Sequence, residues 1–213
     1  MINHKVKRLT LIAAITLGVT NAGWATTTVQ LSAGLGEHGF ATSGGNPIPD
    51  GNSVWIGTFD PGFDVGANEH NPSALQAAWS DYGTGKISSV MDSQGRLVGS
   101  VSSDDSAFNT EQIYWWAFNT SDNAEPTQAF GNVDDYGIFT SLDSSWVFPD
   151  QGVSMLSTTT SSQVIDTAYH GALRDGYLRL ASASVAPAGV PEPGFAWVLI
   201  ALGLFTSTRR SRR

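Results

Sequence analysis

The sequence predicts a mainly β protein, an antiparallel β-sandwich or jelly-roll-like domain with one short helix, flanked by a signal peptide and a single C-terminal transmembrane helix. Three observations predict this arrangement. Short runs of β-branched and aromatic residues recur along the chain, separated by Gly, Asn, Asp and Ser. Both ends of the chain carry an apolar segment beside basic residues. The chain has no cysteine, so a hydrophobic core must stabilise the domain without disulfides.

We divide the 213 residues into three segments: a signal peptide over 1–25, the β-sandwich domain over 26–186, and a linker with a carboxyl-terminal membrane segment over 187–213. The amino end carries Lys5, Lys7 and Arg8, then a short apolar stretch, then small residues before a cleavage site after Ala25. This pattern predicts export and removal of the segment by signal peptidase. The alternative, an uncleaved anchor, is disfavoured because the apolar stretch is too short for a comfortable transmembrane helix.

Within the domain, strands are expected over residues 26–33, 53–59, 86–91, 96–102, 112–119, 136–140, 145–149, 163–169 and 177–184. The segment 112–119 has aromatic residues on both faces. It is therefore expected to be a central strand, buried on both sides or presenting an aromatic platform on one. The one helix is expected to begin at Asn71-Pro72 and to close at Gly83, and its apolar face would contain Leu75, Ala78, Trp79 and Tyr82.

The charge of the domain is strongly negative. Residues 26–190 contain four basic residues against eighteen acidic ones, which gives a formal charge of −14. Such a surface repels phosphate backbones and anionic headgroups, so nucleic-acid binding is not expected. The charge suits a protein that is soluble outside the cell, and it leaves cation binding open as an alternative.

Two glycine-rich segments resemble nucleotide-binding loops but fail their structural requirements. Residues 34–39 match the spacing G-x-G-x-x-G, yet residues 40–47 contain two glycines and a proline and cannot form the helix that this motif needs. Residues 83–86 resemble the end of a P-loop, but Ser80 and Ile87 stand where a Gly and a Ser or Thr are required. We therefore expect no nucleotide cofactor.

The loop between the second expected strand and the helix is dense in oxygen ligands. Asp60, Asp64, Asn68 and Glu69 are weak candidates for calcium ligands, because calcium prefers such oxygens in flexible loops. Their spacing does not match an EF-hand, and a solvated loop is the alternative interpretation. Calcium is the only cofactor for which the sequence offers candidates.

No catalytic motif is present, and we expect no catalytic residues. The domain's histidines, His38, His70 and His170, form neither H-E-x-x-H nor another zinc-binding spacing. No G-x-S-x-G nucleophile elbow occurs. A glycosidase needs two carboxylates at one cleft. The domain has so many carboxylates that their presence neither supports nor excludes this activity.

The tryptophans offer a different functional indication. Aromatic side chains form platforms under saccharide rings, and they also fill cores. Both interpretations apply to the five tryptophans of the domain: Trp55, Trp79, Trp115, Trp116 and Trp146.

The carboxyl end carries the most specific pattern in the chain. The motif Val190-Pro191-Glu192-Pro193 precedes an apolar segment over 194–208 and a basic tail over 209–213 that contains Arg209, Arg210, Arg212 and Arg213. Prolines keep the motif extended and accessible to a processing enzyme, and the arginines favour the cytoplasmic side of the membrane. A Pro-Glu-Pro motif, an apolar segment and a basic tail, in this order, resemble a PEP-CTERM sorting signal. A plain tail anchor is the alternative.

This resemblance implies export by a Gram-negative bacterium, transient anchoring in the inner membrane through the C-terminal helix, and cleavage near Pro191, Glu192 and Pro193 by an exosortase. It also implies a cell-surface or extracellular destination and a link to exopolysaccharide. Residues 53–59, 113–119, 136–140 and 146–149 resemble, more weakly, the uncharacterised sandwich domains that precede such signals. That second resemblance implies a fold and no activity.

The function expected from the sequence is therefore a non-enzymatic, structural or adhesive role at the cell surface or in the extracellular matrix. The alternative is a carbohydrate-binding module, calcium-assisted if the Asp60–Glu69 loop binds the ion. A glycosidase is the third interpretation.

Overall fold

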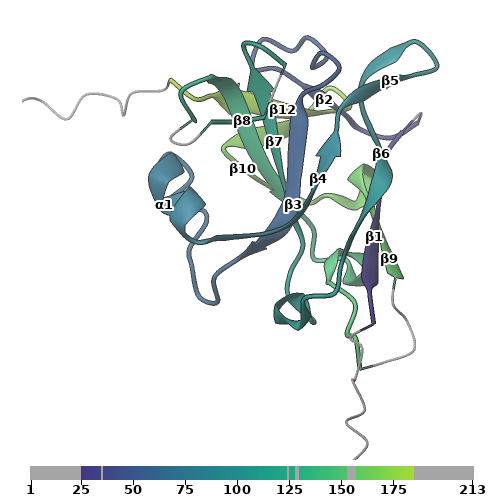
Figure 1. The fold of residues 1–213 in the computed structure, drawn as a ribbon. Coiled ribbons are helices and arrows are strands. Elements are labelled where there is room, and N and C mark those ends of the chain that lie inside the picture. The colour runs from purple at the N-terminus through teal and green to yellow at the C-terminus, as the bar shows by residue number, and fades with distance from the viewer. Residues whose placement is uncertain (1–24, 35, 124, 128–129, 153–156, 185–213) are drawn as a thin grey trace, which may run out of the picture.

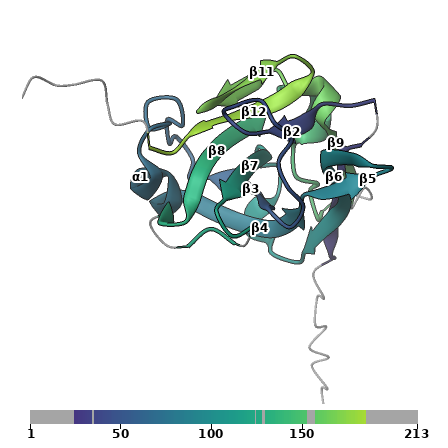
Figure 2. The same ribbon diagram turned by 90° about the horizontal axis from the view of Figure 1, so that it is seen from above.

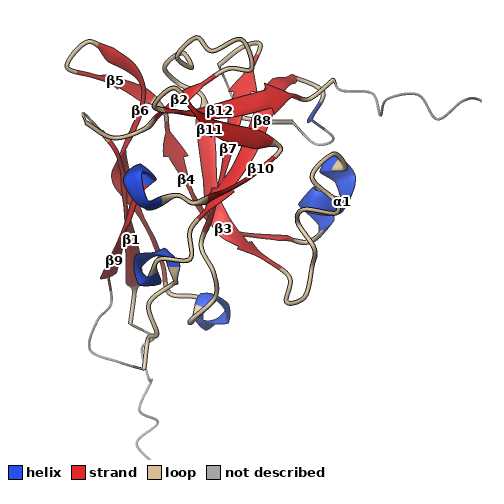
Figure 3. Ribbon diagram, turned by 180° about the vertical axis from the view of Figure 1, so that it is seen from behind, coloured by secondary structure: helices blue, strands red, loops and turns tan. Residues whose placement is uncertain are grey.

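The computed structural model describes residues 25–34, 36–123, 125–127, 130–152 and 157–184. This part of the chain is mainly β, as the sequence predicts, with one short α-helix and a few single-turn 3₁₀ helices (Figure 3). The predicted signal peptide, apart from Ala25, and the predicted PEP motif, transmembrane segment and basic tail lie outside the described residues.

The strands form two sheets. The small sheet has the order β5 (Ser88–Val90), β6 (Ser93–Ser103), β1 (Thr27–Ala33), β9 (Ser157–Ser161). The large sheet has the order β11 (Gly171–Arg174), β12 (Tyr177–Ser182), β8 (Val133–Thr140), β7 (Tyr114–Thr120), β3 (Ser53–Phe59), β4 (Trp79–Lys86). In addition, β10 (Thr167–Tyr169) pairs with β8, and β2 (Gly39–Ala41) pairs with β12. The pairs β1–β9 and β2–β12 are parallel, and the other pairs are antiparallel.

The inner core lies between the two sheets. Alternate residues of β1 point inward, as the pattern of a half-buried strand requires. The inner core contains Val29, Leu31, Leu97 and Val101 from the small sheet and Val54, Ile56, Trp115, Phe139 and Leu178 from the large one. Trp146 and Phe148, which follow β8, complete it.

The outer core lies on the opposite face of the large sheet. Figures 1 and 2 both place α1 (Pro72–Ala77) on the side of the large sheet away from β1 and β9. The outer core is a cluster of buried residues that includes Phe59, Val65, Leu75, Trp116, Phe118, Phe130, Tyr136 and Ile138. Trp55 and Trp79 are only partly buried and pack against its edge.

The central strand β7 separates the two cores. Trp115 and Ala117 belong to the inner core, whereas Trp116 and Phe118 belong to the outer core. All four side chains are 0% exposed. The prediction of a central strand is confirmed, and of its two forms the one buried on both faces is correct.

The predicted helix over residues 71–83 is correct only in its first half. Asn71 caps α1 by accepting a hydrogen bond from the Ala74 N–H, and Pro72 occupies its first turn, as expected. The helix ends at Ala77, however, and the chain continues from Trp79 as strand β4. Tertiary packing explains the difference. A Cβ on Gly85 would approach Leu97 Cδ1 to 2.7 Å, so this glycine lets β4 pack closely against the small sheet.

Three other expectations need correction. The strand expected over 145–149 is a 3₁₀ turn at Ser144–Trp146, because the Asp143 carboxylate caps the turn at the Ser145 N–H. The strand expected over 163–169 is split into a 3₁₀ turn, Ser162–Val164, and β10. The strand expected over 86–91 is interrupted, because β4 ends at Lys86 and β5 covers only residues 88–90. Strands β2 and β9 were not predicted, since each is short and pairs with a distant part of the chain. Strand β11 was not predicted either, although it forms a hairpin with β12, the next strand.

Candidate functional site

The described tryptophans divide into buried and half-exposed groups. Trp115, Trp116 and Trp146 are 0% exposed and fill the two cores. Trp55 and Trp79 retain solvent-accessible surface and lie on the outer face of the large sheet. Of the five tryptophans that the sequence allowed as platform residues, only Trp55 and Trp79 have the exposure that a platform requires.

A hollow of about 280 Å³ lies beside them and is lined by Trp55 from β3 and by Trp79 and Asp81 from β4. We call it the tryptophan hollow. Trp116 lies against both indoles: its ring centroid is 5.6 Å from that of Trp55 and 5.4 Å from that of Trp79. The planes of both indoles stand steeply to Trp116, at 81° and 74°. The buried ring therefore supports two partly exposed ones edge to face, which is a favoured aromatic geometry.

Gly57 determines where the Trp79 ring lies. A Cβ at this position would come within 2.6 Å of the Trp79 Cζ2 atom and 2.2 Å of the Ser80 carbonyl oxygen. The absence of a side chain lets the indole lie against the backbone of β3. The hollow therefore depends on a glycine in the middle of a strand, where glycine is otherwise unfavourable.

A β-bulge sets the direction of Asp81. Ile56 pairs with Gly83 and Gly57 pairs with Asp81, so Tyr82 is an additional residue in β4. Tyr82 turns into the inner core and is 5% exposed. Bulges commonly redirect side chains in this way, and here Asp81 remains exposed beside Trp79.

Glu125 lies at the rim of the tryptophan hollow and is already paired. Its Oε2 accepts a hydrogen bond from Trp55 Nε1 at 3.3 Å, and its Oε1 accepts one from Lys86 Nζ at 2.5 Å. Burial alone would raise the pKa of Glu125, but the hydrogen bonds from Lys86, Ser53 and Trp55 outweigh burial and lower it. Glu125 is therefore an ionised carboxylate held against the Trp55 indole.

Asp81 is in the opposite electrostatic situation. Burial raises its pKa, and the negative charge of Glu125 raises it further. The Trp79 indole and the Gly83 backbone lower it by a smaller amount. The Trp79 Nε1–H nevertheless makes no hydrogen bond of ordinary geometry within the described part of the chain. Among the ion pairs between described residues, none includes Asp81.

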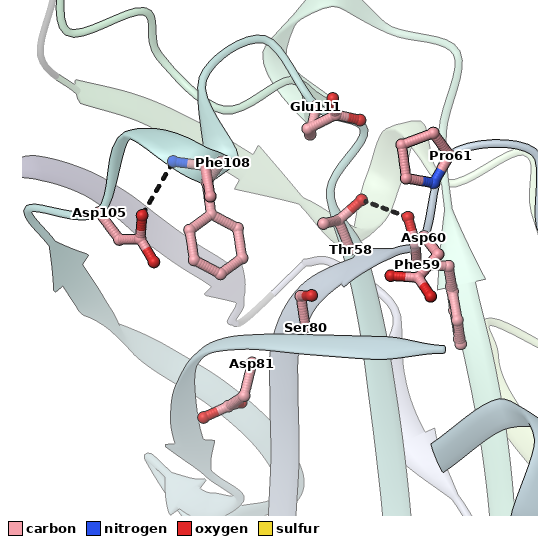
Figure 4. Close-up of a pocket in the computed structure, with 10 residues that line it drawn as sticks. Thr58, Phe59, Asp60, Pro61, Ser80, Asp81, Asp105, Phe108 and Glu111 are labelled. Atoms are coloured by element: carbon pink, nitrogen blue, oxygen red, sulfur yellow. Dashed lines mark hydrogen bonds between the residues drawn. The ribbon is translucent and has the colours of Figure 1, made fainter. Parts of the chain in front are cut away.

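An acidic pocket of about 410 Å³ adjoins the tryptophan hollow and shares Asp81 with it. Three further carboxylates line it: Asp60, Asp105 and Glu111 (Figure 4). In this view Ser80 and Asp81 project from opposite sides of β4, as neighbours in a strand do. Asp105 is partly committed, because it accepts a hydrogen bond from the Ala107 N–H at the start of the 3₁₀ turn Ser106–Phe108.

The predicted calcium candidates are not gathered into one group. Asp60 lines the acidic pocket, whereas the Asp64 carboxylate accepts a hydrogen bond from the Ala67 N–H within its own loop. Asn68 donates to the Asp64 carbonyl, and Glu69 accepts from the His170 N–H. Within the described ranges, no three His, Asp or Glu side chains are arranged to hold a metal ion.

Two histidines that the sequence left without a role lie in contact. His70 Nδ1 and His170 Nδ1 are 3.0 Å apart, although 100 positions separate them. His170 Nε2 must carry a proton, because its partner is the Ser182 carbonyl oxygen, which only accepts. With one proton between the two Nδ1 atoms, His70 donates to His170. Burial lowers the pKa of His170, and the neighbouring His70 lowers it further.

Sequence reasoning missed Asp81 as a site residue because it placed residues 71–83 in one helix. The alternation from Trp79 to Asp81, followed by Gly83 and Gly85, is the signal that could have indicated a strand. Trp55 and Trp79 were both considered as platform residues. No local pattern could have indicated Glu125, whose partners in the structure lie 39 and 70 positions away.

Comparison of the chain with known protein families, with curated proteins and with solved structures finds no match. Among the described residues, no helix has the length and apolar character needed to cross a membrane.

Proposed function

We propose that this chain is an exported, non-enzymatic protein of the cell surface or extracellular matrix, and that its jelly-roll-like sandwich domain binds a saccharide in the tryptophan hollow. The observation that carries the proposal is the pair of half-exposed indoles, Trp55 and Trp79, beside the carboxylate of Asp81. Binding sites for small ligands combine apolar walls with a few polar groups in this way. The adhesive role expected from the sequence and the carbohydrate-binding alternative thereby become one function.

The chemistry of sugars supports this assignment. A saccharide ring presents C–H groups on its faces and hydroxyl groups around its edge. The indole faces suit the former, and the carboxylates of Asp81 and Glu125 are hydrogen-bond acceptors for the latter. Since Trp116 and Gly57 fix the indoles, little side-chain freedom is lost on binding, which favours affinity.

A glycan array followed by calorimetry tests this proposal. Trp79→Ala should weaken binding of the best saccharide by about tenfold or more, the equivalent of one good aromatic contact. Tyr177→Ala is the matched control, since Tyr177 is a partly exposed aromatic side chain that lines a different pocket. Equal affinities of the two variants, or no binding of any saccharide by the wild type, would refute the proposal. A parallel series with EDTA tests calcium assistance.

Export and sorting are part of the same proposal and rest on the amino-acid pattern of the two ends. Processing by an exosortase at the motif would release the domain from the membrane. Replacing Pro191, Glu192 and Pro193 together by Ala should leave an unprocessed, membrane-retained protein in cells that contain the enzyme. Unchanged release of the domain would contradict this part of the proposal.

One observation favours a second candidate function, hydrolysis of a glycosidic bond. The pKa of Asp81 is raised and that of Glu125 is lowered, which is how an acid and a base are differentiated in glycosidases. Incubation of the bound saccharide with the protein, followed by chromatography, decides between the two functions. Intact saccharide supports binding alone, whereas shortened products that disappear with Asp81→Asn indicate catalysis.

A further inference from the structure

The carboxylate in the tryptophan hollow lacks a cationic partner within the described part of the chain. Lys86, the cation of the same strand, is paired with Glu125 on the rim. Asp81 has a neighbouring negative charge and partial burial, and both disfavour its ionised form. A positive charge supplied by a ligand would therefore gain more at Asp81 than at a carboxylate that is already paired.

The two indoles favour the same kind of ligand. The face of a tryptophan ring attracts a cation through its quadrupole, and this attraction is strongest where water is excluded. Trp55 and Trp79 both line the hollow with Asp81, so one ligand group placed there lies near two indoles and a carboxylate. This combination of aromatic rings and an acid is how proteins recognise ammonium groups.

The size and surroundings of the site add to the argument. A volume of about 280 Å³ lies just below the usual range of ligand pockets, so the hollow suits a small group such as a single sugar unit. The adjoining acidic pocket adds the carboxylates of Asp60, Asp105 and Glu111. The domain as a whole has four basic and eighteen acidic residues over 26–190. This field attracts a cationic polymer and repels an anionic one.

We infer that the tryptophan hollow takes the ammonium group of a basic amino sugar, and that the natural ligand is a polysaccharide with free amines rather than a neutral or acidic one. The inference rests on the proposed function, because it specifies the class of saccharide for the same hollow. Asp81 pairs with the ammonium, and the two indoles contact the ammonium and the apolar face of the ring.

The experiment measures binding of three oligosaccharides to the full chain in mild detergent by calorimetry. The probes are a β-linked glucosamine oligomer, its fully N-acetylated counterpart of the same length, and an anionic uronic acid oligomer. The pH is set at about 6, where amines of this kind are protonated. We expect the amine oligomer to bind at least about tenfold more tightly than the acetylated one, and the anionic one not to bind, because the preference depends on charge.

Asp81→Asn is the decisive variant, since Asp81 belongs to neither buried core and its substitution leaves both intact. It should remove the preference for the amine, so that the amine and the acetylated oligomers bind with similar affinity. Asp175→Asn is the matched control. It removes the same charge from the β11–β12 turn, where φ is 54°, a conformation that Asn tolerates well.

The outcomes separate the inference from the proposed function. If the acetylated oligomer binds as tightly as the amine, or if Asp81→Asn and Asp175→Asn behave alike, the hollow binds saccharides but does not select ammonium groups, and the inference is wrong. If no oligomer binds, both the inference and the proposed function fail. As an independent check, tetramethylammonium should compete with the amine oligomer for the wild type and not for Asp81→Asn; absence of competition contradicts the inference.

Discussion

The two faces of the large sheet carry similar aromatic residues but enclose them differently. The inner core is closed by a second sheet, and Trp115 and Trp146 are buried there with ring centroids 4.8 Å apart. Within the described residues, the outer core is covered by a six-residue helix and loops rather than by a second sheet, and Trp55 and Trp79 are partly exposed. The difference teaches that aromatic content alone does not distinguish a core from a binding surface. How completely other elements cover each face of the sheet distinguishes them.

The largest effect is expected from opening the inner core. Trp115→Ala removes a fully buried ring and should lower the free energy of unfolding by about 3–5 kcal/mol. Trp79→Ala removes a half-exposed ring and should cost roughly half of that or less, because less apolar surface returns to water. Urea unfolding of both variants measures the contrast. Equal losses of stability would show that the two faces do not differ as we describe.

A second prediction concerns the glycine under the Trp79 ring. Gly57→Ala places a Cβ against the Ser80 carbonyl and the indole, and should destabilise the protein by about 1–3 kcal/mol, as overpacking does. It should also weaken saccharide binding, since the ring must move.

Gly99→Ala is the matched control for Gly57→Ala. Gly99 lies in β6 of the small sheet, and a Cβ there would have no neighbour within 4 Å. The free energy of unfolding of Gly99→Ala should stay within about 1 kcal/mol of the wild-type value. A Gly57→Ala protein with wild-type stability and affinity would contradict our account of the hollow.

The third prediction uses the histidine pair, which connects the loop before α1 to the start of β11. Because the pKa of His170 is lowered in the folded protein, the unfolded chain binds protons more readily below the ordinary value of 6.5. The contribution of His170 to stability is therefore present above about pH 6.5 and is lost as the pH falls below that value. Thermal unfolding from neutral to mildly acidic pH measures the loss.

Two variants isolate the histidine effect. His170→Asn removes the imidazole at a residue with φ of 44°, a conformation that Asn accepts. It should flatten the pH dependence of the unfolding temperature below about pH 6.5. His38→Gln removes a histidine outside the pair and should retain the wild-type slope. If both variants retain it, the pair does not govern stability in this range.

The smallest effect is expected at the rim of the tryptophan hollow. Lys86 and Glu125 are about half exposed, so Lys86→Gln should cost less than about 1 kcal/mol. The variant should also raise the pKa of Glu125, since Lys86 helps to lower it. Carboxylate titration by NMR checks the direction. An unchanged Glu125 pKa would mean that the ion pair does not persist in solution.

The mainly β fold and the central strand could be predicted because they follow from local patterns. Aromatic residues on both faces of residues 112–119 indicate burial on both sides, and this is what β7 shows. The helix cap at Asn71-Pro72 was predictable for the same reason. The end of that helix was not, because Trp79 and Tyr82 fit a helical spacing as well as they fit a bulged strand.

The candidate site was predictable only in part. The sequence identified Trp55 and Trp79 as possible platform residues, but their exposure depends on which elements cover the sheet. Asp81 gained its position from a bulge, and Glu125 from a loop that returns to β3 and β4. Such placements depend on long-range packing, which no short motif in this chain encodes.

The central claim, that the tryptophan hollow binds a saccharide, is tested most directly by the indole N–H signals of the protein in ¹H–¹⁵N NMR spectra. Single substitutions assign each signal, and a titration with the glucosamine oligomer follows. Our account predicts that the signals of Trp55 and Trp79 shift with saccharide concentration while those of Trp115 and Trp146 stay in place. Saturating saccharide that leaves the Trp55 and Trp79 signals unmoved would contradict it.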